Sequence, residues 1–179
     1  NLNASSIWGD AMTSDLRNRF LEGMSRAATF VAVATTDGEG GRFGVTISSL
    51  TSVSADGDHP SLLACIHHLS PAATAILKNR AFCANLLHEN QQALSDLFAG
   101  RAKADAPSRF EQAAWQPGPH GQPMLTGATA NFECRLATAV LWETHYIIVG
   151  KVTSVALSDD ASALLYGQRA YHRAVQLPE

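Results

Sequence analysis

Hydroxyl side chains are concentrated in one stretch of this sequence, Gly44–Ser54, which reads GVTISSLTSVS. Small hydroxyls beside accessible backbone can bind the carbonyl groups and ring nitrogens of a flat heterocycle, or a phosphate group. Ser and Thr are also common on the exposed face of a strand, where water satisfies their hydroxyls. Composition alone leaves both interpretations open. The hydroxyl-bearing residues are Thr46, Ser48, Ser49, Thr51, Ser52 and Ser54.

Three other patterns suggest a chemistry but lack a residue that it needs. The glycine-rich stretch 38–44 would form a GxGxxG nucleotide fingerprint only with Gly at 43, where Phe43 stands, and it leads into a predicted strand. The segment Gly23–Ala27 resembles a nucleophile elbow but ends a predicted helix. Seven histidines occur without HxxxH or HExxH spacing, and the neighbours His67 and His68 should point to opposite faces of a strand. We therefore expect no Rossmann-type site, no hydrolase triad and no bound metal.

The composition narrows the possible partners. The chain has 179 residues, of which 46% are hydrophobic and only 16% charged, with a net charge of −3. Lys and Arg form no run, which argues against a nucleic-acid partner, and no apolar run approaches the length of a membrane span. A chain with so little charge is expected to cover apolar surface by forming an oligomer.

The cysteines and the N-terminus indicate the compartment. Cys65, Cys83 and Cys134 lie far apart in apolar runs without a CxxC motif, so we expect buried, reduced thiols. The start of the chain has no signal-peptide pattern. Both observations predict a cytoplasmic protein.

The elements that must position the hydroxyl stretch are mainly strands. Ser14 is expected to cap a helix running to Arg26, and the glycine-rich turn 37–42 joins a buried strand, Thr29–Thr36, to a strand at Phe43–Val53. Because the link is short, these two strands should form an antiparallel hairpin. Further strands are predicted at Ser61–His67, Ala81–Leu87, Thr129–Val140, Tyr146–Leu157 and Ala163–Tyr166.

Two further helices are expected between the strands. Ser70 and Pro71 begin one that runs to about Asn79, and Asn90 caps another that Gly100 ends. We expect residues 101–107 to be mobile and residues 116–123 to form a Pro/Gly-rich loop. The sum is a mainly β protein, an antiparallel barrel with helical insertions, in a single domain at residues 14–179 after an N-terminal extension at residues 1–13.

Several motifs in the same order resemble the flavin reductase family, the small reductase components of two-component flavin monooxygenases. They are GVTISSLTSVS, SLLACIHHLSPAATAI, AFCANLL, LSDLFAG, RFEQAAWQPGPHGQPMLTGATANFECRL, THYIIVGKV and LLYGQRAYHRA. The resemblance implies a split β-barrel with a Greek-key core, usually a homodimer. It also implies an enzyme that binds FMN or FAD, oxidises NADH or NADPH, and delivers reduced flavin to a partner flavin-dependent monooxygenase.

The same resemblance implies where the ligands bind. The flavin would contact the strand and turn at Thr46, Ser48, Ser49, Ser52, Val53 and Ser54, with the loop and strand positions His68, Ser70 and Asn85 near its ribityl chain, phosphate or adenosine portion. His145 would position the nicotinamide, and Tyr171 and His172 would border the same pocket. The chain differs from common family patterns at Thr29, His59-Pro60 and Glu143-Thr144, differences that bear on nucleotide preference.

Two alternatives use the same fold. In one, the protein retains its flavin and reduces another acceptor, such as a corrinoid. In the other, it is a non-catalytic flavin- or haem-binding protein.

Overall fold

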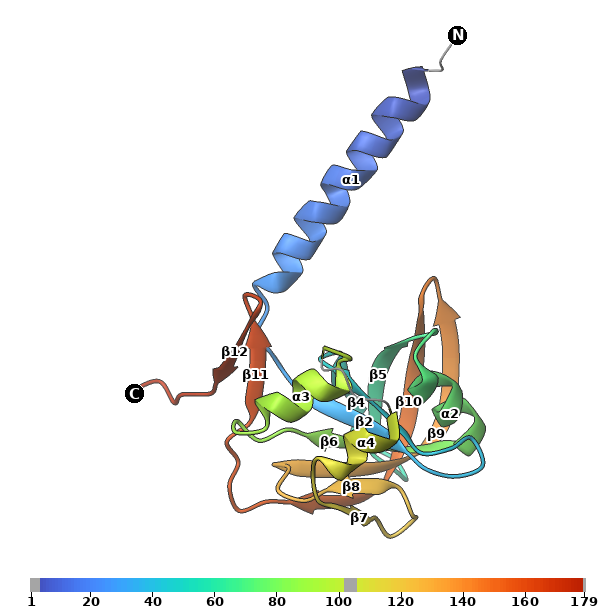
Figure 1. Cartoon of the computed structure of the whole chain (residues 1–179), viewed down its shortest axis with the longest axis vertical. Coiled ribbons are helices and arrows are strands. Elements are labelled where there is room, and N and C mark those ends of the chain that lie inside the picture. The colour runs from blue at the N-terminus through green and yellow to red at the C-terminus, as the bar shows by residue number, and fades with distance from the viewer. Residues whose placement is uncertain (1–3, 102–105, 179) are drawn as a thin grey trace.

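Two strands of thirteen residues each, β9 (Ala130–Trp142) and β10 (His145–Leu157), form a long hairpin around which the other strands are arranged (Figure 1). The computed structural model describes residues 4–101 and 106–178. β9 and β10 belong to an antiparallel sheet of seven strands with the order β3-β2-β6-β9-β10-β5-β4. The other members are β2 (Ala32–Thr36), β3 (Phe43–Ile47), β4 (Leu50–Ser54), β5 (Ser61–His67) and β6 (Ala81–Leu86).

The remaining elements flank this sheet. A three-stranded sheet has the order β1-β11-β12, and β7 pairs with β8. Their bounds are β1 (Thr29–Phe30), β7 (Trp115–Pro117), β8 (Pro123–Leu125), β11 (Leu164–Gly167) and β12 (Ala170–Arg173). The helices are α1 (Ala4–Ser25), α2 (Pro71–Asn79), α3 (Gln92–Phe98) and α4 (Ala106–Glu111). No helix of the described residues is both long and apolar enough to cross a membrane.

Two apolar cores lie on either side of β2. Ala32 and Ala34 face one core together with Ile76 of α2, whereas Val33 faces the other together with Phe98 of α3. This alternation follows from the period of two in a strand. At Gly44 the chain passes so close to Phe98 that a Cβ atom would lie 2.6 Å from its ring, so a glycine is needed there.

The sheets do not close into a continuous barrel, and their pairs are antiparallel, as the split-barrel expectation requires. The strand at Ser61–His67 and the helix from Pro71 to Asn79 are confirmed. α3 ends before Gly100, whose φ of 73° is the left-handed conformation expected of a helix-terminating glycine.

The prediction of one strand over Phe43–Val53 is wrong. The chain breaks at Ser48 and Ser49 into β3 and β4, which occupy opposite edges of the seven-stranded sheet. The hydroxyl stretch therefore turns a corner between two edges and does not form one continuous row.

Other boundaries also differ from expectation. α1 begins at Ala4, so Ser14 lies inside the helix and is not its cap, and the N-cap of α3 is Gln91 and not Asn90. The strands β7, β8 and β12 and the helix α4 were not predicted. Of the segment expected to be mobile, residues 102–105 lie outside the described residues, as do residues 1–3 of the expected extension.

The cysteines are unpaired, and two of them are fully buried. Cys83 and Cys134 lie in the core, whereas Cys65 is half-buried. Burial raises the pKa of the Cys134 thiol to about 12 and raises that of Cys83 further. The expectation of buried thiols is thus confirmed for two of the three.

Candidate functional site

Several of the predicted site residues meet at one end of the seven-stranded sheet, which we call the histidine end and define as Ser48, Ser49, residues 67–70, Thr144 and His145. Ser49 joins β4 to β5, because its hydroxyl donates to Cys65 O (2.8 Å) and accepts from Cys65 N (3.1 Å). His145 lies opposite His67 in the β10–β5 ladder. The backbone N–H of His68 donates to Thr144 O (2.9 Å). Three segments distant in sequence are thereby held together.

Three imidazole rings pack together at this end. The ring centroid of His67 lies 5.0 Å from that of His145, in a T-shaped arrangement, and 4.9 Å from that of His68. The expectation that His67 and His68 face opposite ways is wrong, because His68 lies past the end of β5, where the strand alternation no longer applies. Within the described residues, no group of three or more His, Cys, Asp or Glu side chains could hold a metal ion.

Hydrogen bonds orient two of these rings. Leu69 N donates to His67 Nδ1 (3.1 Å), which leaves Nε2 as the protonated nitrogen of that ring. The Nδ1 atom of His145 lies 2.9 Å from Thr144 Oγ1. His145 Nε2 has no partner among the described residues and remains available to a ligand.

Polar atoms without protein partners gather at the same place. His68 Nδ1 is buried and has no hydrogen-bond partner among the described residues. Ser70 occupies the N-cap position of α2, ahead of Pro71, yet its hydroxyl makes no cap hydrogen bond. A buried polar atom without a partner is rare in native proteins and indicates a missing water or ligand. The residues at this end therefore fit a polar ligand.

The remaining hydroxyls of the stretch are divided between internal and exposed positions. Thr46 donates to Ser95 O of α3 (2.7 Å), and Ser54 donates to Asp56 O (3.1 Å). Ser48 and Ser52 are exposed, and their hydroxyls have no partner among the described residues. Val53 is also exposed, on the edge strand β4.

Asn85 lies away from any surface that a ligand could reach. Its side chain is fully buried, and Oδ1 accepts from Leu125 N and from Asn131 Nδ2, both at 2.8 Å. Nδ2 donates to Val33 O and to Thr35 Oγ1, both at 2.9 Å. With these bonds Asn85 ties β6 to β2, β8 and β9, and the structure does not bring it to the histidine end.

Tyr171 and His172 lie in the small sheet, on the far side of the molecule from the turn of the β9–β10 hairpin (Figure 1). The Tyr171 hydroxyl donates to Asp96 Oδ1 (2.8 Å) and lies 2.9 Å from Ser95 Oγ, while burial raises its pKa. His172 Nε2 lies 2.9 Å from Gly167 O. In the single chain neither residue borders His145.

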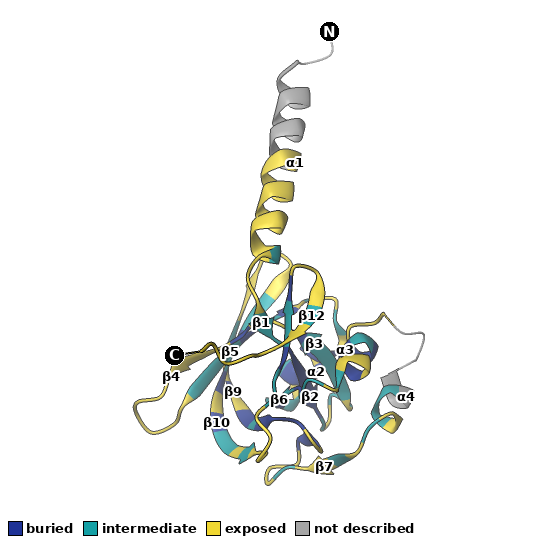
Figure 2. Ribbon diagram, turned by 90° about the vertical axis from the view of Figure 1, so that its left-hand side faces the viewer, coloured by how far each residue is buried: buried dark blue, intermediate teal, exposed yellow. Residues whose placement is uncertain are grey.

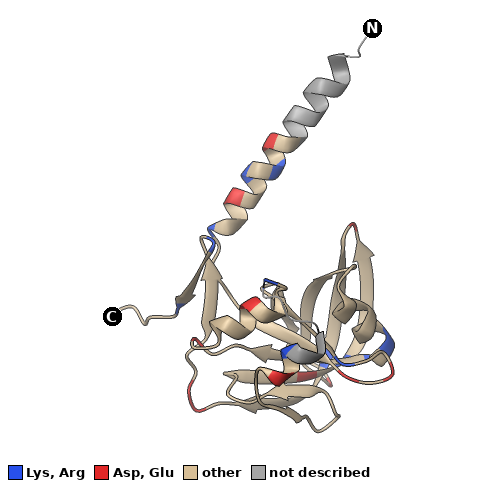
Figure 3. Ribbon diagram, viewed as in Figure 1, with Lys and Arg blue, Asp and Glu red and all other residues tan. Residues whose placement is uncertain are grey.

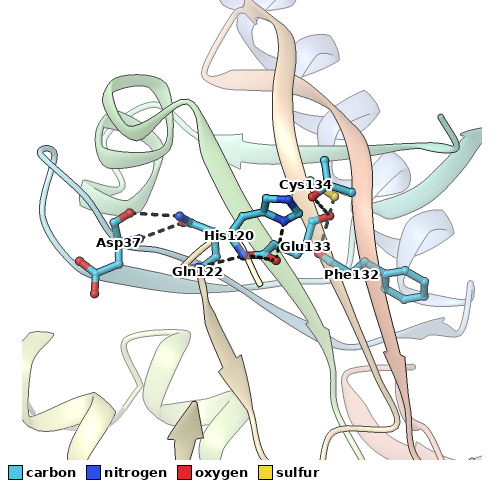
Figure 4. A network of polar contacts seen from close by, with 7 residues as sticks. Asp37, His120, Gln122, Phe132, Glu133 and Cys134 are labelled. Atoms are coloured by element: carbon cyan, nitrogen blue, oxygen red, sulfur yellow. Dashed lines mark hydrogen bonds and ion pairs between the residues drawn. The ribbon is translucent and has the colours of Figure 1, made fainter. Parts of the chain in front are cut away.

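A buried carboxylate that the sequence did not single out holds the loop 118–122 onto the sheet (Figure 4). Glu133 of β9 is 1% exposed and accepts from the backbone N–H groups of His120 (3.0 Å) and Gln122 (2.9 Å), with His120 Nδ1 at 3.1 Å. The Gln122 side chain accepts from Asp37 N (3.0 Å) and donates to Asp37 O (3.2 Å), which fixes the turn before β3. In the sequence, Asn131, Glu133 and Arg135 alternate with Phe132, Cys134 and Leu136, a period of two that predicts a half-exposed strand with Glu133 on its polar face. The one sequence feature related to the burial of Glu133 is the Pro/Gly-rich loop at residues 116–123, which covers this side chain.

Comparisons with known proteins agree with one another. A family model described as "Flavin reductase like domain" matches residues 24–174. The FMN reductase (NADH) RutF of Methylorubrum extorquens is 39% identical over 159 residues, covering 89% of this chain and 76% of that protein. The protein of the same name from Ancylobacter novellus is 36% identical over 163 residues, covering 91% and 88%. The crystal structure of BorF, the flavin reductase component of a bacterial two-component tryptophan halogenase, superposes with a TM-score of 0.79 at 30% identity, covering 92% of this chain and 99% of that one.

Proposed function

This chain belongs to the flavin reductase-like family, and from that premise we propose that it is an NADH-dependent FMN reductase that supplies reduced flavin to a partner monooxygenase. The observation that carries the proposal is the histidine end, where unpartnered polar atoms meet within a chain matched to the family over residues 24–174. FMN and NADH are preferred over FAD and NADPH because two relatives at 36–39% identity are named for them.

The residues present fit a flavin along the edge strand β4 and at the histidine end. The exposed hydroxyls of Ser48 and Ser52 and the side chain of Val53 would hold its ring system, together with the backbone near Ser49 and Ser54. Ser70 and His68, whose Oγ and Nδ1 lack protein partners, would hold its polar tail. When bound, the flavin supplies the hydride acceptor, so the protein needs no nucleophile of its own.

The chain's own task is orientation. His145 Nε2 is placed to donate or accept a hydrogen bond at the carboxamide of the nicotinamide, while Thr144 and the edge of His67 fix the plane of the ring. Holding the two ring systems in contact removes most of the entropic barrier to hydride transfer. Backbone N–H groups and hydroxyls near Ser52 would stabilise the negative charge of the reduced product.

Steady-state NADH and NADPH oxidation with FMN, FAD and riboflavin in turn tests the proposal. We expect NADH with FMN to give the highest kcat/KM. Flavin that co-purifies without exchanging, combined with slow reduction of added FMN, would favour the alternative that reduces a separate acceptor. Flavin binding without oxidation of either nucleotide would favour the non-catalytic alternative.

We further propose a homodimer in the cytoplasm. The described surface exposes apolar side chains on α1 and along the outer half of the β9–β10 hairpin, and the low charge of the chain agrees with a covered surface. Its unpaired cysteines suit a reducing compartment. Sedimentation of the purified protein at micromolar concentration measures the oligomeric state. A monomer at that concentration contradicts the dimer without touching the reductase proposal.

A further inference from the structure

Helix α1 extends away from the domain that carries it (Figures 1 and 2). Its last turn is held by the β11–β12 turn, where Arg169 Nη2 lies 3.2 Å from Glu22 Oε2 and Gln168 N donates to Ser25 O (2.5 Å). Gln168 and Arg169 both have positive φ angles, 49° and 61°, a conformation that is unfavourable for residues with side chains. The last turn of the helix is therefore attached to the domain at a specific, strained turn.

One face of α1 is apolar and exposed. Leu16, Phe20 and Met24 follow one another at intervals of four residues and are 70%, 62% and 56% exposed, with Leu21 beside them. We call these four residues the helix stripe. An isolated amphipathic helix gains most of its stability by burying such a face, so the stripe requires a partner surface.

The same chain exposes a second apolar surface at the outer end of the β9–β10 hairpin. Val140, Leu141 and Trp142 are 53%, 51% and 69% exposed. Successive residues of a strand face opposite ways, so the hairpin is uncovered on both faces here. Residues 137–146, the outer end of the hairpin, include one charged side chain, Glu143 at the turn, as Figure 3 shows.

We propose that the helix stripe of one copy packs on the face of the hairpin that carries Val140 and Trp142 in a second copy, and the reverse, in the dimer proposed above. Helix α1 and the tip of the β9–β10 hairpin extend from the same end of the domain, apart from one another at their bases (Figure 1), so a twofold axis can bring each helix to the other copy's hairpin. At about 200 Å² per large side chain, the exposed fractions of the helix stripe, Val140 and Trp142 give each copy roughly 700 Å² to bury. That is close to half of a standard interface, the share one partner contributes.

The contact also completes the site. Trp142 lies opposite His145 in the β9–β10 ladder, and His145 packs on His67. A helix seated on Trp142 therefore lies beside the imidazole rings at which we placed the nicotinamide. The second copy's α1 becomes a wall of that site, a consequence that rests on the proposed function.

Cross-linking between two distinguishable copies tests the contact directly. Chains with Leu16→Cys or Met24→Cys and a long tag are co-expressed with chains with Val140→Cys and a short tag, all with Cys65→Ser because Cys65 is the half-buried native thiol. A short bismaleimide should give a product of the summed mass with at least one end of the stripe, whichever way the helix runs. Asp15→Cys, on the opposite face of α1, is the matched control and should give far less product.

Charge substitutions test the energetic importance of the contact. Phe20→Asp and Trp142→Asp replace side chains exposed in the single chain, so the circular dichroism spectrum should be retained while the dimer dissociates at least 100-fold more readily. Asp15→Ala should leave the dimer unchanged. A wild-type monomer, a dimer without the mixed cross-link, or a dimer unaffected by either Asp variant overturns the inference. NADH oxidation by the wild type is measured separately, so a failed contact and a failed reductase function give different results.

Discussion

The histidine end and the two buried residues Asn85 and Glu133 use polar side chains for opposite purposes. Around Asn85 and Glu133 the protein itself supplies the hydrogen-bond partners, from backbone N–H groups, carbonyls and neighbouring side chains. At the histidine end, His68 Nδ1 and the Ser70 hydroxyl have no such partners. A polar group that is satisfied internally contributes to folding, whereas one left unsatisfied is available for a ligand. Residue type alone does not separate the two roles.

The largest effect that this comparison predicts is on stability, at Glu133. Glu133→Ala removes the acceptor of two backbone N–H groups and of His120. At about 1–3 kcal/mol for each buried donor left unpaired, the free energy of unfolding should fall by about 3–5 kcal/mol. Urea denaturation measures the loss. Glu39→Ala, at an exposed carboxylate, is the control and should change stability by less than about 0.5 kcal/mol. If both substitutions changed the free energy of unfolding by the same small amount, Glu133 would not be a residue that stabilises the fold.

Asn85 gives the sharper distinction, because the family resemblance assigns it to the cofactor. Asn85→Ala leaves Leu125 N and Asn131 Nδ2 without their acceptor, and we expect a loss of about 2–3 kcal/mol in the free energy of unfolding. The affinity of the folded variant for FMN, measured by fluorescence quenching, should stay within about twofold of the wild type. A tenfold weaker affinity with unchanged stability would place Asn85 at the ligand after all.

How far the sequence determines the fold is clearest in β9 and at Ser48. The strands and helices that depend on local signals, such as β5 and α2, are predicted correctly from alternation and from Ser70-Pro71. The period of two in β9 predicts that Asn131 and Glu133 are exposed, yet both are buried, because the β7–β8 hairpin and the loop before β8 cover that face. Covering by a distant segment has no local signature.

The candidate site shows the same limit. The residue types around Ser48, His68 and His145 are visible in the sequence, but their meeting point depends on the break between β3 and β4 and on the β10–β5 register. Tyr171 and Asn85 have equally suitable side chains and are engaged elsewhere by Asp96 and Leu125. Only tertiary pairing decides which polar groups are satisfied.

On the ligand side of the comparison, Ser52→Phe should weaken FMN binding by about 30-fold, corresponding to about 2 kcal/mol. Ser52 is exposed on β4 with no partner for its hydroxyl among the described residues, so the ring adds bulk at the ligand surface without disturbing the core. Lys151→Phe, at an exposed strand position on β10 that is not assigned to the flavin, is the matched control. Fluorescence titration of both variants decides the matter, and equal affinities for FMN would exclude this face of β4 as the flavin site.

His145 and His172 provide a kinetic version of the same contrast. His145→Ala removes an exposed ring with an available Nε2, and we expect the KM for NADH to rise about fivefold with little change in melting temperature. His172 already contacts Gly167 O, so His172→Ala should leave the KM for NADH unchanged. Initial rates over a range of NADH concentrations give the KM of each variant. A larger rise in KM for His172→Ala than for His145→Ala would indicate that NADH binds at the three-stranded sheet.

The smallest predicted effect concerns His88 and Asp160. These two side chains bond to each other, as the buried polar groups do, but they lie near the surface. His88 Nε2 lies 3.0 Å from Asp160 Oδ2, and this contact raises the pKa of His88 above its ordinary 6.5. Hydrogen bonds from Ser162, followed by that from His88, lower the pKa of Asp160 from 3.8 to about 2. The pair joins the end of β6 to the segment before β11, alongside the bond from Glu89 N to Ser162 O.

The sign of the pH dependence follows from these two directions. A raised histidine pKa stabilises the fold fully below pH 6.5 and ceases to do so as the pH rises through the folded value, whereas the lowered aspartate pKa stabilises above 3.8. His88→Ala should therefore lower the melting temperature by about 1–3 °C near pH 5 and by less near pH 9. His59→Ala, at an exposed histidine, should show no such difference. If the loss at His88 were larger in alkali, the pair would stabilise the fold through packing and not through charge.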